Sequence, residues 1–229
     1  MNKSILVFAA HPDDQVHGCA RTIATHAAYG DHVQLLIVAE GATSRHQSRD
    51  RNQAIDQFSA LEQAAKKAGV ILGSHRVELM ALPHNRHDSL DRLDLIKQIE
   101  ERIACYEPQG VNPSRAGDVN VDHRPFLEAV ITACRPTPFQ PVERLLGFEV
   151  PSSTEWQHPV LALVTQRNWF VEITAHWSRQ REALSAYVSE MRPWPHARLL
   201  EVLEHVARWR GVQVGCEAGD EFCLLRHLE

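Results

Sequence analysis

The sequence of 229 residues has no apolar stretch approaching the ~20 residues that a membrane-spanning helix requires, so we expect no membrane segment. Lys3 and the apolar run SILVFAA have the outline of a short signal peptide. That run ends in charged residues after about seven positions, which suits a buried β-strand better than a secretion signal.

Cysteine is sparse, with five widely spaced residues and no CxxC pair. An odd number of cysteines without a secretion signal favours reduced thiols and a cytoplasmic location. Long runs of Lys or Arg are also missing, and the net charge is -5 with His neutral. We therefore expect no nucleic-acid-binding surface.

Internal repeats, low-complexity segments and a linker that would divide the chain are absent from the sequence. The hydrophobic share of 44% is ordinary for a globular protein, so we expect one domain over residues 1–229. Histidine, by contrast, is abundant, and its 14 residues slightly favour metal chemistry.

Short apolar runs alternate with amphipathic patterns along the chain. This alternation predicts an α/β, Rossmann-like fold: a mostly parallel sheet with helices on both faces and a helical C-terminal extension. The predicted strands are 4–10, 32–40, 75–82, 144–150 and 168–173, and the predicted helices are 15–30, 51–69, 89–106, 121–135, 178–191 and 196–211.

Polar segments follow three of the predicted strands: AHPDD, EGATSR and LPHNR. In parallel sheets, ligands bind beyond the carboxyl ends of the strands, because those ends share one edge. We therefore expect these three loops to form one site.

The HPDD segment predicts metal ligands. His11 and Asp14 can face the same way at i, i+3 spacing, and a cation would offset the repulsion between the adjacent aspartates. A hydrolytic zinc site usually has three protein ligands and an open position for water, and His123 is the candidate third ligand. Asp13 would then be free to act as a general base.

Ordinary helix capping is the competing interpretation of both segments. Proline and aspartate are favourable at a helix start, and Asn120 or Asp122 could cap the helix that His123 opens.

AHPDD near the start, followed later by DH, resembles the LmbE-like or PIG-L-type zinc N-deacetylases, which remove acetyl groups from N-acetylglucosamine-type sugars. The resemblance covers nearly the whole chain. The further segments that carry it are EGATSR, LPHNR, GDVNVDHR, FEVPSSTEW, SEMRPWPH and ARWRG.

This resemblance implies a zinc ion held by His11, Asp14 and His123, with Fe²⁺ able to occupy the same ligands. It also implies that Asp13 takes a proton from the attacking water while zinc stabilises the tetrahedral oxyanion. Asp122 would orient a metal ligand or an acid without binding the metal itself. The implied substrate is a small amino sugar that is either activated, by a nucleotide or phosphate linkage, or lipid-free, and a homo-oligomer is a further expectation.

The chain departs from the family pattern at three places. Gln15 stands where the family usually has Glu, and Asn120 stands where many members have a histidine that acts as general acid. A Thr-His-His run typical of the similar branch reads Pro113-Ser114-Arg115. Either another group or Asp13 itself protonates the departing amine, or the chemistry is weakened, redirected or reduced to sugar binding. The intact ligands and base favour retained hydrolysis.

Four residues are candidates for substrate binding: Arg49, Asn85, Arg86 and Arg115. Arg49, with Arg45, suits a phosphate or sugar hydroxyls, although a solvated helix start explains both equally well. Turn chemistry is the alternative for Asn85 and Arg86. In MRPWPH, the residues Arg192, Trp194 and His196 suit sugar binding, and packing of the Trp between prolines is the alternative.

Overall fold

The computed structural model describes residues 2–43, 50, 52, 54–158 and 167–229. Its centre is a seven-stranded sheet in the order β3-β2-β1-β4-β5-β7-β6, in which β7 runs antiparallel to β5 and β6 and the other pairs are parallel. The fold class expected from the sequence is confirmed. The strands are β1 (Ser4–Ala9), β2 (His32–Ala39), β3 (Arg76–Leu82), β4 (Gly110–Pro113), β5 (Arg144–Phe148), β6 (Trp169–Glu172) and β7 (Gly219–His227).

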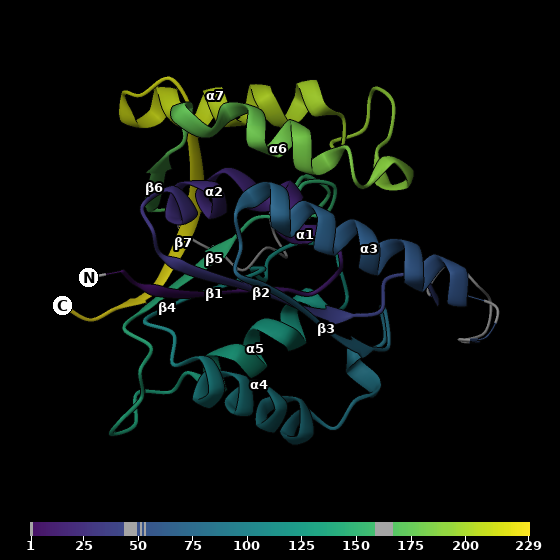
Figure 1. The fold of residues 1–229 in the computed structure, drawn as a ribbon, viewed down its shortest axis with the longest axis vertical. Helices are drawn as coiled ribbons and strands as arrows, with labels where there is room; N and C mark the ends of the chain where they lie inside the picture. The colour runs from purple at the N-terminus through teal and green to yellow at the C-terminus, as the bar shows by residue number, and fades with distance from the viewer. Residues whose placement is uncertain (1, 44–49, 51, 53, 159–166) are drawn as a thin grey trace.

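Helices cover both faces of this sheet (Figure 1). One face carries α1 (Asp14–Gly18), α2 (Ala20–Ala28), α3 (Ile55–Leu72), α6 (Trp177–Leu184) and α7 (Leu200–Val214), and the other carries α4 (Arg92–Tyr106) and α5 (His123–Ala133). Three short 3-10 segments complete the described elements: η2 (His87–Ser89), η3 (Thr174–His176) and η4 (Val188–Glu190). No helix in this part of the chain is long and apolar enough to span a membrane.

The central strand β1 explains why SILVFA is apolar at every position but the first. Its odd-numbered residues from Ile5 to Ala9 enter the core under α2 and α3, and its even-numbered residues Leu6 and Phe8 enter the core under α4 and α5. Because both faces are covered, the strand reads as a continuous apolar run instead of an alternating one. The AHPDD segment therefore lies at the carboxyl-end edge of the sheet, where β1 ends.

The first two predicted helices have different boundaries in the structure. The helix expected over 15–30 is interrupted at Cys19, where the backbone leaves helical geometry, and forms α1 and α2. Gly69 does not end the next helix. A side chain there would meet Val77 Cγ2 at 2.3 Å, so glycine serves close packing, and α3 ends at Gly73 with a positive φ.

The C-terminal part is helical, as expected, but it also contributes strands. The helix expected over 178–191 ends at Leu184 and is followed by η4, and the helix expected over 196–211 begins at Leu200. The sequence patterns did not predict β7, which inserts between β5 and β6. The five cysteines, all within the described residues, form no disulfide.

Gly18, the last residue of α1, provides a test of how tightly this helix packs against the end of β5. A Cβ at this position would lie 2.2 Å from the Glu149 carbonyl oxygen and 2.6 Å from Phe148 Cδ2. We expect Gly18→Ala to lower the free energy of unfolding by about 1–3 kcal/mol through overpacking. Because Asp14 opens the same helix, metal binding should weaken as well.

Urea denaturation and metal titration measure the two effects. Gly215→Ala is the control, because its Cβ would have no neighbour within 4 Å and only the positive φ is strained. It should leave metal binding unchanged. Wild-type stability in Gly18→Ala would show that this contact is not tight.

Candidate active site

Three candidate ligands meet where β1 and β4 lie side by side. His11 follows β1, Asp14 opens α1, and His123 opens α5 after β4. One ligand atom from each lies within 4.8 Å of the others, and the residues are 5%, 1% and 1% exposed. From β1 the chain continues to β2 and β3 on one side of the sheet, and β4 and β5 then follow on the other side of β1. The junction of β1 and β4 is therefore the topological switch point, where parallel sheets of this kind bind ligands.

Each histidine turns one ring nitrogen to a supporting carboxylate and the other toward Asp14. His11 Nε2 lies 3.0 Å from Asp122 Oδ2, and its Nδ1 lies 3.4 Å from Asp14 Oδ2. His123 Nδ1 lies 2.6 Å from Asp118 Oδ2, and its Nε2 lies 3.2 Å from Asp14 Oδ2. Carboxylate support on the outer nitrogen is the usual arrangement for metal-binding histidines.

Electrostatics at this cluster favour a cation. Burial opposes protonation of His11, but Asp14 and Asp122 outweigh it and raise its pKa to about 9. Burial is likewise outweighed at His123, where Asp14 and Asp118 raise the pKa to about 10. In return, the two histidines hold the pKa of Asp14 well below its usual range despite burial.

A divalent metal fits these residues. His123 Nε2 is buried and makes no hydrogen bond, which leaves a donor atom aimed at the cluster. Two imidazoles and one carboxylate form a common donor set for catalytic zinc, and they also accept iron.

Helix capping does not explain the acidic residues. Asp13 and Asp122 occupy the N-cap positions of α1 and α5, yet neither side chain makes a capping hydrogen bond. Asp91, by contrast, caps α4 by accepting from the Leu93 backbone N–H.

Asp13 lines the same cavity as His11, and its carboxylate contacts Arg198 and His17. Its Oδ2 accepts a hydrogen bond from Arg198 Nη1 at 2.6 Å, and His17 Nε2 lies 3.6 Å away. Burial alone would raise the pKa of Asp13, but Arg198 and His17 outweigh it and hold the pKa well below its usual range. The carboxylate is therefore ionised.

Asp122 holds the loop after β3. Its carboxylate accepts from the backbone N–H of Asn85 at 2.6 Å and of His87 at 2.9 Å, in addition to its contact with His11. This network brings the LPHNRH segment over the cluster, where the His84 ring lies 4.5 Å from the His11 ring. Asp122 thus supports His11, not its sequence neighbour His123.

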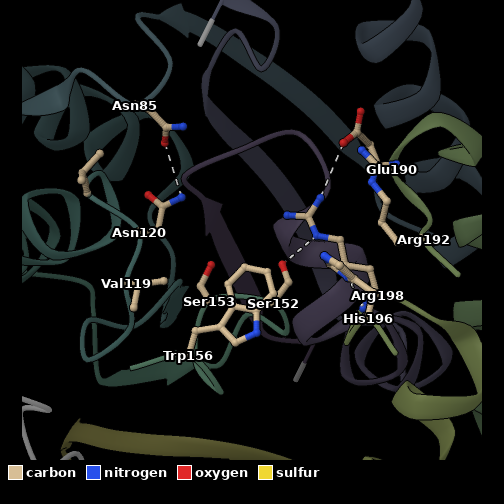
Figure 2. Close-up of a pocket in the computed structure, with 11 residues that line it drawn as sticks. Asn85, Val119, Asn120, Ser152, Ser153, Trp156, Glu190, Arg192, His196 and Arg198 are labelled. Carbon is tan, nitrogen blue, oxygen red and sulfur yellow. Dashed lines mark hydrogen bonds and ion pairs between the residues drawn. The ribbon is translucent and has the colours of Figure 1, made fainter. Parts of the chain in front are cut away.

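A two-part cleft opens above the cluster. The inner cavity of about 220 Å³ is lined by His11, Asp13, His84 and others, and the outer cavity of about 410 Å³ is lined by side chains from five segments (Figure 2). The residues shared by both cavities are Asn85, Asn120, Glu190 and Arg198.

The other predicted site residues have different surroundings. Asn85 and Asn120 lie in the cleft, whereas Arg86 is exposed and lines neither cavity. Arg115 is buried, with Nη2 3.5 Å from Glu149 Oε2, and is also outside both linings. Arg49, like Arg45, falls outside the described residues.

Gln15 and Ser114 line neither cavity. Both are buried, and the Gln15 amide donates to the Pro12 carbonyl oxygen and the Tyr187 hydroxyl. Both of these partners are uncharged, which suits the uncharged amide of Gln15.

Sequence reasoning missed Asp118, Arg198 and the aromatic residue of the cleft. Trp156, from FEVPSSTEW, lines the outer cavity, while Trp194 of MRPWPH is 75% exposed and lines neither cavity. Asp118 precedes His123 by five residues, a local signal that could have been used. Arg198 is 185 positions from Asp13, and no local pattern marks that pairing.

The comparisons with known proteins give the family. Residues 6–134, more than half of the chain, match the PIG-L family, described as GlcNAc-PI de-N-acetylase. The chain belongs to this family of deacetylases, which confirms the resemblance noted in the sequence. It is similar to the uncharacterized deacetylase YaiS of Escherichia coli (strain K12), at 28% identity over 157 residues that cover 66% of this chain and 76% of YaiS.

Two solved structures share the fold. GalB, the 4-carboxy-2-hydroxymuconate hydratase from Pseudomonas putida KT2440, has a TM-score of 0.75 at 21% identity, covering 99% of this chain and 98% of GalB. The N,N'-diacetylchitobiose deacetylase from Pyrococcus horikoshii has a TM-score of 0.70 at 18% identity, covering 98% and 84%. At these identities the likeness concerns the fold alone.

Asp118 allows a test of the metal centre that leaves the three candidate ligands in place. Asp118→Asn removes the charge behind His123, and we expect affinity for Zn²⁺ to fall about 10–100-fold. Competition with a chromophoric chelator measures this. Asp88→Asn, on the exposed loop of η2, is the matched control and should keep wild-type affinity. Unchanged affinity in Asp118→Asn would contradict metal binding by His123.

Proposed function

We propose that this protein is a zinc-dependent hydrolase that removes the acetyl group from an N-acetyl amino sugar. The observation that carries the proposal is the buried cluster of His11, Asp14 and His123 beside the ionised carboxylate of Asp13, at the bottom of one cleft. Membership of the PIG-L family supports the reaction type.

The three clustered residues would hold the metal. A divalent cation there supplies a Lewis acid for the amide carbonyl and a lowered pKa for a bound water. The support of His11 by Asp122 and of His123 by Asp118 fixes the ring orientations that this requires.

Asp13 acts as the general base in this proposal. It accepts a proton as water adds to the amide carbon, and it returns that proton to the nitrogen as the C–N bond breaks, which yields acetate and a free amine. Arg198 orients this carboxylate and keeps it ionised before the first transfer. Asn120 lines the same cavity but cannot act as an acid, so a proton carried by Asp13 removes the need for a separate donor.

A second candidate is a metal-dependent reaction other than amide hydrolysis. The specific observation in its favour is Asn120, an amide in the cavity wall where many relatives have an acid histidine. The fold is shared with a hydratase, which shows that it supports water addition in another protein. Under this alternative the protein binds metal but releases no acetate, and under a binding-only alternative it turns over no substrate.

Substitutions at two neighbouring aspartates distinguish these candidate functions. We expect Asp13→Asn to keep the metal and lower acetate release about 10²–10⁴-fold, because the general base is lost. Asp14→Asn should lose the metal itself, since a ligand is removed. Metal content is measured on protein purified without a metal-affinity column, and acetate release is measured with a panel of N-acetylhexosamines. Full activity in Asp13→Asn would exclude the proposed base.

A further inference from the structure

The outer cavity extends the site well beyond the space that an acetamide needs. Its volume of about 410 Å³ lies within the roughly 300–1,000 Å³ range of small-molecule sites. The inner cavity shares four lining residues with it, so one ligand can reach from the candidate metal ligands into the outer part.

One wall of the outer cavity suits a sugar ring. Trp156 is 59% exposed and stands edge-on to His196, with ring centroids 5.4 Å apart at 88°. Such an exposed indole offers an apolar face, while Ser153 and the Asn85–Asn120 amide pair offer polar partners for hydroxyl groups.

Two arginines with different surroundings lie across the cavity from Asn85 and Asn120 (Figure 2). Arg198 is compensated by carboxylates, with Nη1 2.6 Å from Asp13 Oδ2 and 3.5 Å from Glu190 Oε2. Arg192 makes no ion pair with the residues that the structure describes. Its Nη1 donates to the carbonyl oxygens of Ser189, at 2.5 Å, and Met191, at 2.9 Å.

These two backbone hydrogen bonds hold the Arg192 guanidinium through one nitrogen and leave its other N–H donors for a ligand. In the same cavity, burial and the nearby cations Arg198 and Arg192 lower the pKa of His196. An uncompensated, oriented guanidinium is suited to bidentate binding of a carboxylate or phosphate.

We propose that the substrate carries an anionic group, a carboxylate or a phosphate, which Arg192 binds in the outer cavity while the acetamide occupies the inner one. Arg192 is then a specificity-determining residue. This inference rests on the proposed deacetylase function, and the experiment is designed so that either can fail without the other.

The experiment compares four probes: N-acetylglucosamine, its 1-phosphate and 6-phosphate, and N-acetylmuramic acid, which bears a carboxylate. We expect at least one charged probe to exceed the neutral sugar in kcat/KM for acetate release by about 10–100-fold. The phosphate and carboxylate probes identify which anion is preferred. Raising the salt concentration should reduce the preference.

Variants assign the preference to Arg192. Arg192→Gln should lower the charged-to-neutral ratio of kcat/KM about tenfold or more, and Arg192→Lys, which keeps the charge, should give an intermediate ratio. Arg179→Gln on the outer side of α6, where Arg179 is half-exposed and pairs with Glu182, is the matched control and should keep the wild-type ratio.

Two outcomes overturn the inference and leave the proposed deacetylase standing: equal kcat/KM for neutral and charged probes, or an unchanged ratio in Arg192→Gln. If no probe releases acetate, the proposed function fails for these sugars, and calorimetric binding of the same probes decides the anion site. A Kd for a charged probe about tenfold weaker in Arg192→Gln supports the site, and equal Kd values exclude it.

Discussion

Asp14, a carboxylate buried between two imidazoles, is the interaction on which the rest of the site depends. Burying a lone charge is unfavourable, so Asp14 needs positive partners, either protons on His11 and His123 or a metal ion. The junction of β1 and β4 supplies the place, because two parallel strands end there side by side and each is followed by a helix that opens at a ligand.

Carboxylates arranged around this centre give each loop its position. Asp122 and Asp118 stand behind the two histidines, and Asp122 also fixes the loop after β3 through two backbone N–H groups. Asp13 links the same centre to the C-terminal segment through Arg198. Residues from four parts of the chain are thus held by short polar contacts, and the cleft is the space between them.

The sequence predicted the parts of this site that are local. HPDD contains two of the three clustered candidate ligands and the proposed base, because their spacing already places them at the end of an apolar run, and His123 followed from a second acidic helix start. Arg198 and Trp156 could not be predicted in the same way, since their places depend on how distant segments pack. The antiparallel strand β7 was missed for the same reason, and the break at Cys19 is a backbone turn that apolar periodicity does not reveal.

The position of β7 has a consequence for how the protein forms during synthesis. This strand, Gly219–His227, lies between β5 and β6 and is the only neighbour of β6 in the sheet. A nascent chain that ends before β7 can assemble β1 to β5, but it cannot attach β6 and leaves an edge of β5 unpaired. Residue 198 also leaves the ribosome long after residue 13. The three candidate metal ligands are therefore all synthesised once residue 123 is reached, near the middle of the chain, whereas the arginine that pairs with Asp13 follows much later.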